Sequence, residues 1–187
     1  MITVLVVDDN GPVRKTLRSL LESADDIKLV DTATNGVEAV EKARLHRPDV
    51  AVMDISMPLM DGLEATEQIR ECCRLTRVII LSGFDTSEYI QRGLEVGAKG
   101  YVLKDVAQED LLEAIHVVIN GKIDTWNTLR ASVGDRVDGI DFDELIRRAE
   151  RQAEQLERRR VDVATKALSN RDEPTAEQSS TPLAAGY

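Results

Sequence analysis

Five short apolar segments alternate with helical patterns over the first two-thirds of this 187-residue chain. Most of these segments lack a polarity period of two, as is typical of strands buried on both faces. The repeated alternation predicts an α/β fold, in which a parallel sheet carries helices on both faces and the crossovers are right-handed. We expect the common five-stranded order 2-1-3-4-5. The predicted strands cover residues 2–7, 27–30, 50–53, 78–81 and 101–103.

Amphipathic helical patterns follow each predicted strand. Pro12 suits the first turn of the first helix, and Gly97 and Gly121 suit the ends of later ones. The predicted helices lie near residues 13–21, 36–46, 61–73, 87–96 and 111–119.

Polar residues stand at the carboxyl ends of four of the five predicted strands. In open α/β sheets, ligands bind at these ends, where the strand order reverses. With the order 2-1-3-4-5, the first and third strands flank that point, so the polar residues are expected to converge. They are Asp8 and Asp9 after the first strand, Asp54 after the third, Ser82 after the fourth and Lys104 after the fifth.

These residue types suit phosphoryl transfer. Three carboxylates in one cleft repel one another and favour Mg²⁺, which takes oxygen ligands and needs only one or two carboxylates. A remaining carboxylate is then free to attack a phosphoryl donor and form an acyl phosphate. The Lys104 ammonium, the Ser82 hydroxyl and the metal would neutralise the phosphoryl oxygens during transfer.

The motifs VLVVDDN, VMDISMPLMDG, LSG and GAKGYVLKD resemble the receiver domain of bacterial two-component response regulators. The resemblance covers about residues 1–121 and implies a flavodoxin-like (βα)5 fold. It implies that Asp54 accepts a phosphoryl group from a sensor histidine kinase. It also implies that Asp9 binds Mg²⁺ directly and Asp8 through a water. Asp54 itself and the backbone carbonyl of Ser56 would complete the protein ligands.

The same resemblance implies a switch. Ser82 would bond a phosphoryl oxygen, Lys104 would pair with the phosphoryl group, and Tyr101 would turn inward as Ser82 moves. The serine at position 82 departs from the commoner threonine but keeps the hydroxyl. The surface formed by the fourth helix, fifth strand and fifth helix would then change its preferred partner. Pro58 and Gly62 match the loop after the phosphoacceptor, where Pro58 fixes the backbone and Gly62 supplies a tight turn.

The last third of the chain does not match this pattern. Receivers whose fifth strand reads GYVLKD commonly precede a helix-turn-helix domain, and no such pattern follows here. Residues 122–140 indicate a linker, 141–168 a long amphipathic helix and 169–187 a disordered tail. The helix has a heptad seam that is rich in alanine and interrupted by Arg160. A weak dimeric coiled coil, packing on the receiver and packing on a partner all remain open.

Charge, cysteine content and the length of apolar runs argue against several classes of protein. The net charge of −10 argues against a general nucleic-acid-coating role. The two cysteines, Cys72 and Cys73, provide no disulfide framework and no metal-ligand spacing, so we interpret them as reduced thiols near a helix end. No apolar run approaches the ~20 residues of a membrane span, and the N-terminus lacks a secretory signal pattern. A cytoplasmic protein is therefore expected.

The sequence favours a phosphorylation-controlled signalling switch rather than an enzyme. Its output would be protein contact, including homodimerisation through the fourth helix–fifth strand–fifth helix face or residues 141–168. A transcription regulator with a diverged DNA-binding C-terminal region is the first alternative, and salt-dependent DNA binding would favour it. A haloacid dehalogenase-like phosphatase is less favoured because it needs a second Asp where Ser56 stands. The intact acidic cluster argues against a phosphate-blind scaffold.

Overall fold

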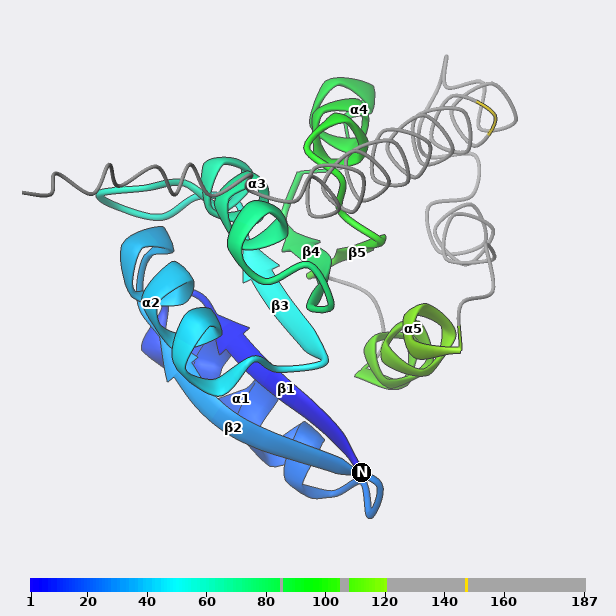
Figure 1. Cartoon of the computed structure of the whole chain (residues 1–187). Coiled ribbons are helices and arrows are strands. Elements are labelled where there is room, and N and C mark those ends of the chain that lie inside the picture. Colours follow the sequence, from blue (N-terminus) through cyan, green and yellow to red (C-terminus); the bar gives the residue numbers. More distant parts are fainter. Residues whose placement is uncertain (85, 105–107, 121–146, 148–187) are drawn as a thin grey trace, which may run out of the picture. The chain divides into compact units, whose positions relative to one another are not determined.

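The computed structural model describes residues 1–84, 86–104, 108–120 and 147, and these residues form a parallel sheet flanked by helices (Figure 1). The strand order β2-β1-β3-β4-β5 confirms the predicted order. The strands are β1 (Ile2–Val7), β2 (Ile27–Ala33), β3 (Val50–Asp54), β4 (Arg77–Ser82) and β5 (Gly100–Leu103). The helices are α1 (Gly11–Glu22), α2 (Gly36–His46), α3 (Gly62–Cys72), α4 (Ser87–Glu95) and α5 (Gln108–Ile119).

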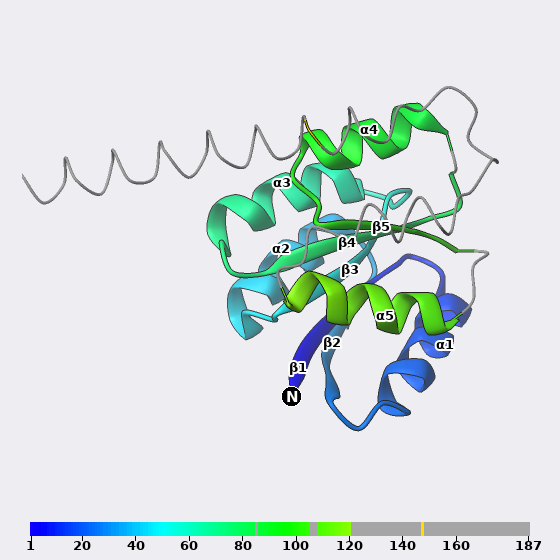
Figure 2. The same ribbon diagram turned by 90° about the vertical axis from the view of Figure 1, so that its right-hand side faces the viewer.

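The helices cover the sheet in two layers (Figure 2). Helices α2, α3 and α4 pack on one face, and α1 and α5 pack on the other. Every residue of β3 is buried, which explains why its sequence shows no alternation of polar and apolar residues. Each large aliphatic side chain buried in these layers stabilises the fold by roughly 1.5–3 kcal/mol.

The edge strand β2 is longer than the sequence predicted. The apolar run stops at Val30, but the pairing of β2 with β1 continues to Ala33. Asp31 lies in this extra stretch, where its carboxylate meets the Lys42 ammonium at 3.4 Å and the His46 ring at 3.3 Å. An edge strand can carry a polar residue such as Asp31, because residues of α2 can pair with its side chain.

Side-chain caps fix the starts of three helices at the sheet's carboxyl edge. Asn10 accepts a hydrogen bond from the Val13 amide, Asn35 accepts one from Glu38, and Asp61 accepts two from the first turn of α3. Such caps contribute about 1 kcal/mol each. Because α1 and α3 are the next elements after β1 and β3, these caps also limit how far the connecting loops can move.

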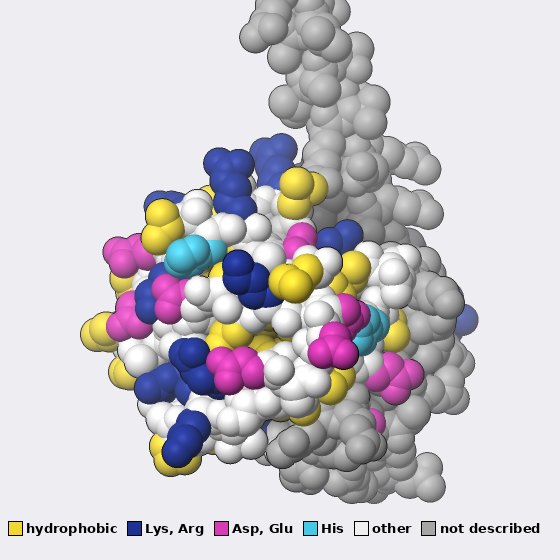
Figure 3. Space-filling model, turned by 90° about the horizontal axis from the view of Figure 1, so that it is seen from below, with side chains coloured by type: hydrophobic (Ala, Val, Ile, Leu, Met, Phe, Trp, Pro, Cys, Tyr) yellow, Lys and Arg dark blue, Asp and Glu magenta, His cyan; other side chains and the backbone are white. Residues whose placement is uncertain are grey.

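Predictions for residues 122–187 lie outside the described residues, except that Arg147 is helical. The predicted helix end at Gly121 also lies outside them. None of the described helices combines the length and apolar character needed to cross a bilayer. Figure 3 shows basic and acidic side chains interspersed over the face seen from below.

Candidate functional site

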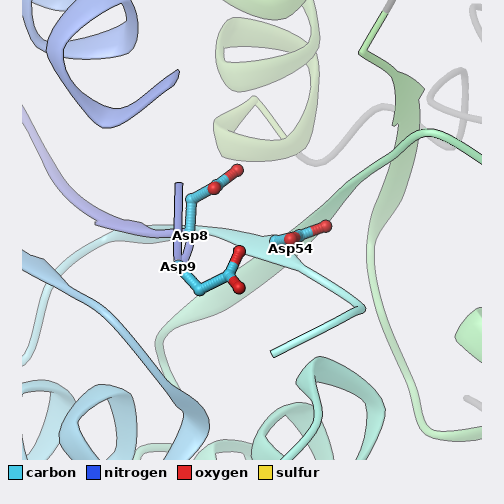
Figure 4. A group of neighbouring side chains, drawn as sticks. All are labelled: Asp8, Asp9 and Asp54. Atoms are coloured by element: carbon cyan, nitrogen blue, oxygen red, sulfur yellow. The ribbon is translucent and has the colours of Figure 1, made fainter. Parts of the chain in front are cut away.

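Three carboxylates meet at the carboxyl edge of the sheet. Asp8 and Asp9 directly follow β1, and Asp54 is the last residue of the neighbouring strand β3. One oxygen from each lies within 4.8 Å of the others, and the three side chains extend to the same side of the strand ends (Figure 4). Asp8 and Asp54 are buried, whereas Asp9 is exposed. The predicted convergence of these three residues is confirmed.

Lys104 bridges two of these carboxylates. Its Nζ lies 2.8 Å from Asp8 Oδ2 and 3.0 Å from Asp54 Oδ1. The backbone amide of Lys104 donates a 2.8 Å hydrogen bond to the carbonyl of Ser82, which ties the end of β5 to the end of β4. A lysine from one strand end therefore reaches across the edge to acids from two others.

The pKa directions of this group reflect the balance between burial and charge. Burial raises the pKa of Asp54 above its ordinary value, and Asp8 adds to this rise, although Lys104 opposes it. Burial alone would lower the pKa of Lys104, but its contacts with Asp8 and Asp54 raise it overall. Lys104 is therefore held in its charged form. Burial makes the ionised form of Asp54 less favourable, and a further cation beside it would offset this penalty.

The acidic group fits a hard divalent cation. Asp8 Oδ2 is buried without a well-aligned hydrogen-bond donor, even though the Lys104 ammonium is close. One lysine shared with Asp54 only partly offsets the charge of this buried oxygen, and a metal ion would add a second cation. The exposure of Asp9 leaves room for water, which Mg²⁺ keeps in its octahedral shell. The donor set consists of oxygen atoms, as Mg²⁺ requires.

Two residues that the sequence reasoning did not select hold Asp8 in place. The Asn10 amide donates a 2.8 Å hydrogen bond to Asp8 Oδ1, and the Arg14 guanidinium donates a 2.7 Å hydrogen bond to the Asp8 carbonyl. The position of Asn10 just before Pro12 is an N-cap signal that could have identified it. Nothing in the spacing marks Arg14, because its role depends on how α1 lies over the loop.

The loop after Asp54 is held by a close backbone approach at Gly62. A Cβ at position 62 would lie 1.8 Å from the Asp54 carbonyl oxygen, and the Gly62 amide donates a 2.9 Å hydrogen bond to the carbonyl of Ile55. The predicted tight turn is not what requires glycine at position 62, because its φ is not positive. Glycine is required because a Cβ has no room beside the Asp54 carbonyl. In this loop the left-handed backbone conformation falls on Leu59, whose φ is 69°.

A γ-turn surrounds Leu59. The Met60 amide donates a 2.8 Å hydrogen bond to the Pro58 carbonyl, two residues earlier. The Met60 carbonyl in turn accepts a 3.1 Å hydrogen bond from the amide of Gly36, the first residue of α2. These contacts connect α2 to the loop that follows Asp54.

Ser82 and Tyr101 occupy buried positions at the ends of β4 and on β5. The Ser82 hydroxyl accepts a 3.0 Å hydrogen bond from the Phe84 amide, which leaves its hydrogen available to donate. The Tyr101 hydroxyl donates a 2.7 Å hydrogen bond to the Phe84 carbonyl, and the residue is 1% exposed. Tyr101 is thus already in the inward position that the switch hypothesis assigns to the phosphorylated chain.

An open pocket of about 520 Å³ lies beside the acidic group. Asp9 and Ser56 line it, together with Tyr89 and Arg92 of α4. Ser56 is exposed there and lines the same pocket as Asp9. A phosphoryl donor can therefore approach the acidic edge through a space bounded by the β3–α3 loop and α4.

Comparisons with known proteins agree with this geometry. The chain is 42% identical over 119 residues to the oxygen regulatory protein NreC of Staphylococcus carnosus, covering 63% of this chain and 55% of that protein. It is 36% identical over 169 residues to the transcriptional regulatory protein YdfI of Bacillus subtilis, covering 90% of this chain and 76% of that protein. The chain spans little more than half the length of several of the curated relatives it matches.

Solved structures give the same result. The signal receiver domain of the putative response regulator NarL from Mycobacterium tuberculosis matches with a TM-score of 0.63 and 30% identity, covering 65% of this chain and 98% of that one. A two-component response regulator of the LuxR family from Aurantimonas matches with a TM-score of 0.64 and 29% identity, covering 82% of this chain and 99% of that one.

The family comparison covers most of the folded region. Residues 4–116 match the family described as the response regulator receiver domain. These residues include β2 to β5, all but the first two residues of β1, both acids after β1, Asp54 and Lys104. The chain belongs to the response regulator receiver domain family, the receivers of two-component systems.

Proposed function

We propose that Asp54 accepts a phosphoryl group from a sensor histidine kinase in a Mg²⁺-dependent reaction, and that this modification switches a protein-contact surface. The observation that carries the proposal is the Lys104 ammonium, which lies within 3.0 Å of the buried Asp8 and Asp54 carboxylates at the carboxyl edge of the sheet. A nucleophilic carboxylate, a fixed cation and two further acids for a metal are the parts that phosphoryl transfer to an aspartate needs.

The chain's own residues account for the transfer step. An oxygen of Asp54 attacks the phosphorus of a phosphohistidine, so that a new P–O bond forms as the P–N bond breaks. The electron pair leaves with the imidazole, which takes up a proton. Lys104 remains paired with the phosphoryl oxygens after transfer, and the Ser82 hydroxyl donates its hydrogen to one of them.

Asp8, Asp9, Asp54 and the backbone carbonyl of Ser56 would hold Mg²⁺. The burial of Asp8 beside a lysine that it shares with Asp54, and the exposure of Asp9, support this ligand set. When bound, the metal supplies positive charge against the phosphoryl oxygens. Without it, the phosphoryl charge would add to three carboxylates that already repel one another.

The output depends on the aromatic residues near Phe84. Tyr101 holds the Phe84 carbonyl, and the Phe84 ring stacks on Tyr89 of α4 with centroids 4.4 Å apart. The Ser82 hydroxyl accepts a hydrogen bond from the Phe84 backbone amide. When Ser82 moves toward a phosphoryl oxygen, this hydrogen bond pulls on Phe84. The β4–α4 loop therefore transmits the modification to the face formed by α4, β5 and α5, which we propose as the contact surface for a partner or a second copy.

The chain acts as a phosphoacceptor rather than as a phosphatase of external substrates. Haloacid dehalogenase-like phosphatases use a second aspartate two residues after the nucleophile as a general acid and base. Ser56 occupies that position and cannot supply a carboxyl group. Turnover is then limited to formation and hydrolysis of the chain's own acyl phosphate.

Transcription regulation is the second candidate, and one specific observation favours it. The match to YdfI extends over 169 residues, well beyond the receiver, so residues after 121 share sequence with a transcriptional regulatory protein. In this case the proposed linker 122–140 and helix 141–168 would belong to a diverged DNA-binding region. Binding of duplex DNA that weakens steeply with added salt would support this candidate, and no binding at low salt would reject it.

The intact mass of the full chain tests the phosphoacceptor. After treatment with acetyl phosphate and Mg²⁺, the wild type should gain the mass of one phosphoryl group and lose it when hydroxylamine is added. Asp54→Asn should gain none, whereas Asp25→Asn, which removes an exposed aspartate away from the edge, should behave as wild type. Equal modification of the wild type and Asp54→Asn would overturn the proposal.

A further inference from the structure

The two cysteines lie together at the end of α3. Cys72 is the last residue of the helix, and Cys73 follows with φ −131° and ψ 64°. In a continuing helix, consecutive side chains point to different sides. Because Cys73 leaves the helical conformation, its side chain turns back toward Cys72, and the two sulfurs lie 3.4 Å apart. The helix end therefore creates a pair of neighbouring thiols.

A disulfide does not suit this pair. Adjacent residues have Cα atoms about 3.8 Å apart, whereas disulfides need about 4.4–6.8 Å. The sulfurs would also have to close from 3.4 Å to about 2.05 Å. An S–S bond here would be strained and easily reduced. A bridging atom between the sulfurs needs no such approach.

The spacing suits one thiophilic atom bound by both sulfurs. With sulfur bonds of about 2.3 Å, as in zinc thiolates, two sulfurs lie about 3.8 Å apart at a tetrahedral angle. The separation falls toward the observed 3.4 Å at the smaller angles of a pyramidal, three-coordinate centre. Within the described residues, the group able to offer three metal ligands is the acidic one, so this pair offers two sulfurs and no third protein ligand nearby.

The surroundings define an order of reaction. Cys72 is exposed and interacts with the Arg44 guanidinium, whereas Cys73 is buried. Burial, together with the hydrogen bond to Cys72, raises the pKa of Cys73 to about 11. Cys73 alone is therefore a weak nucleophile, and Cys72 is the point of entry for a reagent. Once Cys72 is bound, the second sulfur is already in place.

We propose that Cys72 and Cys73 form a vicinal dithiol site that binds trivalent arsenicals. An organoarsenous oxide would exchange its As–O bonds for two As–S bonds, and the two thiol protons would leave with the oxygen as water. The oxidation states of arsenic and sulfur do not change, so the reaction needs no oxidant or reductant. The site lies at the far end of α3 from Gly62, about 15 Å along the helix at 1.5 Å per residue.

Phenylarsine oxide and intact mass spectrometry test the proposal on the reduced full chain, whose two cysteines are its only thiols. The wild type should take up one phenylarsenic group that survives a large excess of a monothiol and is removed by a dithiol. Because the second sulfur acts within the same molecule, this adduct should resist the monothiol about 10²–10⁴-fold better than a one-sulfur adduct.

Single substitutions separate chelation from simple reactivity. Cys72→Ser and Cys73→Ser should each lose the monothiol-resistant adduct. Cys72 is exposed, so Cys72→Ser tests the proposal even where Cys73→Ser unfolds. Asp54→Asn should retain the adduct, which keeps this result independent of the phosphoacceptor. A resistant adduct on Cys72→Ser, or a wild-type adduct that the monothiol strips as fast as those of the variants, would overturn the proposal.

Discussion

Lys104→Met removes the ammonium that lies between two buried carboxylates while keeping most of the apolar side chain. Breaking a buried ion pair by deleting one partner costs about 3–5 kcal/mol. Lys104 contacts both Asp8 and Asp54, but its side chain is 27% exposed, so water replaces part of the lost interaction. We therefore expect the free energy of unfolding at neutral pH to fall by about 3 kcal/mol, at the lower end of that range.

The pH dependence of this loss gives the sharper test. The folded pKa of Asp54 is raised above the ordinary value of 3.8, and removal of Lys104 raises it further. The folded variant then holds the Asp54 proton more tightly than the unfolded chain does. Its stability deficit is therefore small near the unfolded pKa, grows as pH rises, and is complete above the folded pKa.

Urea unfolding at pH 4.5 and 7.5, without divalent cations, measures both effects. The deficit of Lys104→Met should be clearly smaller at pH 4.5. Lys15→Met, at an exposed lysine on α1, should change the unfolding free energy by less than about 0.5 kcal/mol at either pH. A Lys104→Met variant as stable as wild type at pH 7.5, or equally destabilised at both values, would refute the proposed balance of burial and charge.

Three further outcomes follow from the same structure. Gly62→Ala should lower the free energy of unfolding by about 3 kcal/mol because its Cβ meets the Asp54 carbonyl, whereas Gly83→Ala, with no atom within 4 Å, should change little in the same urea titration. Tyr101→Phe should cost about 1 kcal/mol through loss of its bond to Phe84, and an unchanged urea midpoint would contradict this. Mg²⁺ should raise the melting temperature of the wild type but not of a variant in which Asp8 and Asp9 are both asparagine, and equal shifts would remove these acids from the metal site.

Most of the fold was predictable because strands buried on both faces leave a continuous apolar signal. The observed ends of β1 match the prediction, and those of β3, β4 and β5 differ by one residue at most. The prediction failed on β2, where Asp31 and Thr32 continue the pairing with β1 after the apolar run has ended. Polar residues on an edge strand carry no sequence signal for pairing.

The parts of the site that stand at strand ends were predictable from the sequence. Parallel strands bring their carboxyl ends to one edge, which is enough to place Asp8, Asp54 and Lys104 together. The contacts of Arg14 with the Asp8 backbone, the need for space at Gly62 and the inward position of Tyr101 were not predictable. Each of these depends on how closely two backbone segments approach, and residue spacing along the chain does not encode that distance.

The closeness of the two cysteine sulfurs was also not predictable from the sequence. Adjacent cysteines in a regular helix would point apart, so their spacing in the sequence gave no reason to expect a site. The 3.4 Å separation of their sulfurs depends on the helix ending between them. The structure therefore adds a chemical feature that the sequence pattern did not indicate.

Mapping the phosphorylated residue tests the central claim most directly. Reduction of the acetyl phosphate-treated chain with borohydride converts an aspartyl phosphate to homoserine, which peptide sequencing by mass spectrometry locates. Homoserine at position 54, formed with Mg²⁺ and absent when the metal is chelated, is the predicted result. Homoserine at position 8 or 9, or equal labelling with and without Mg²⁺, would contradict the assignment of Asp54 as the metal-assisted nucleophile.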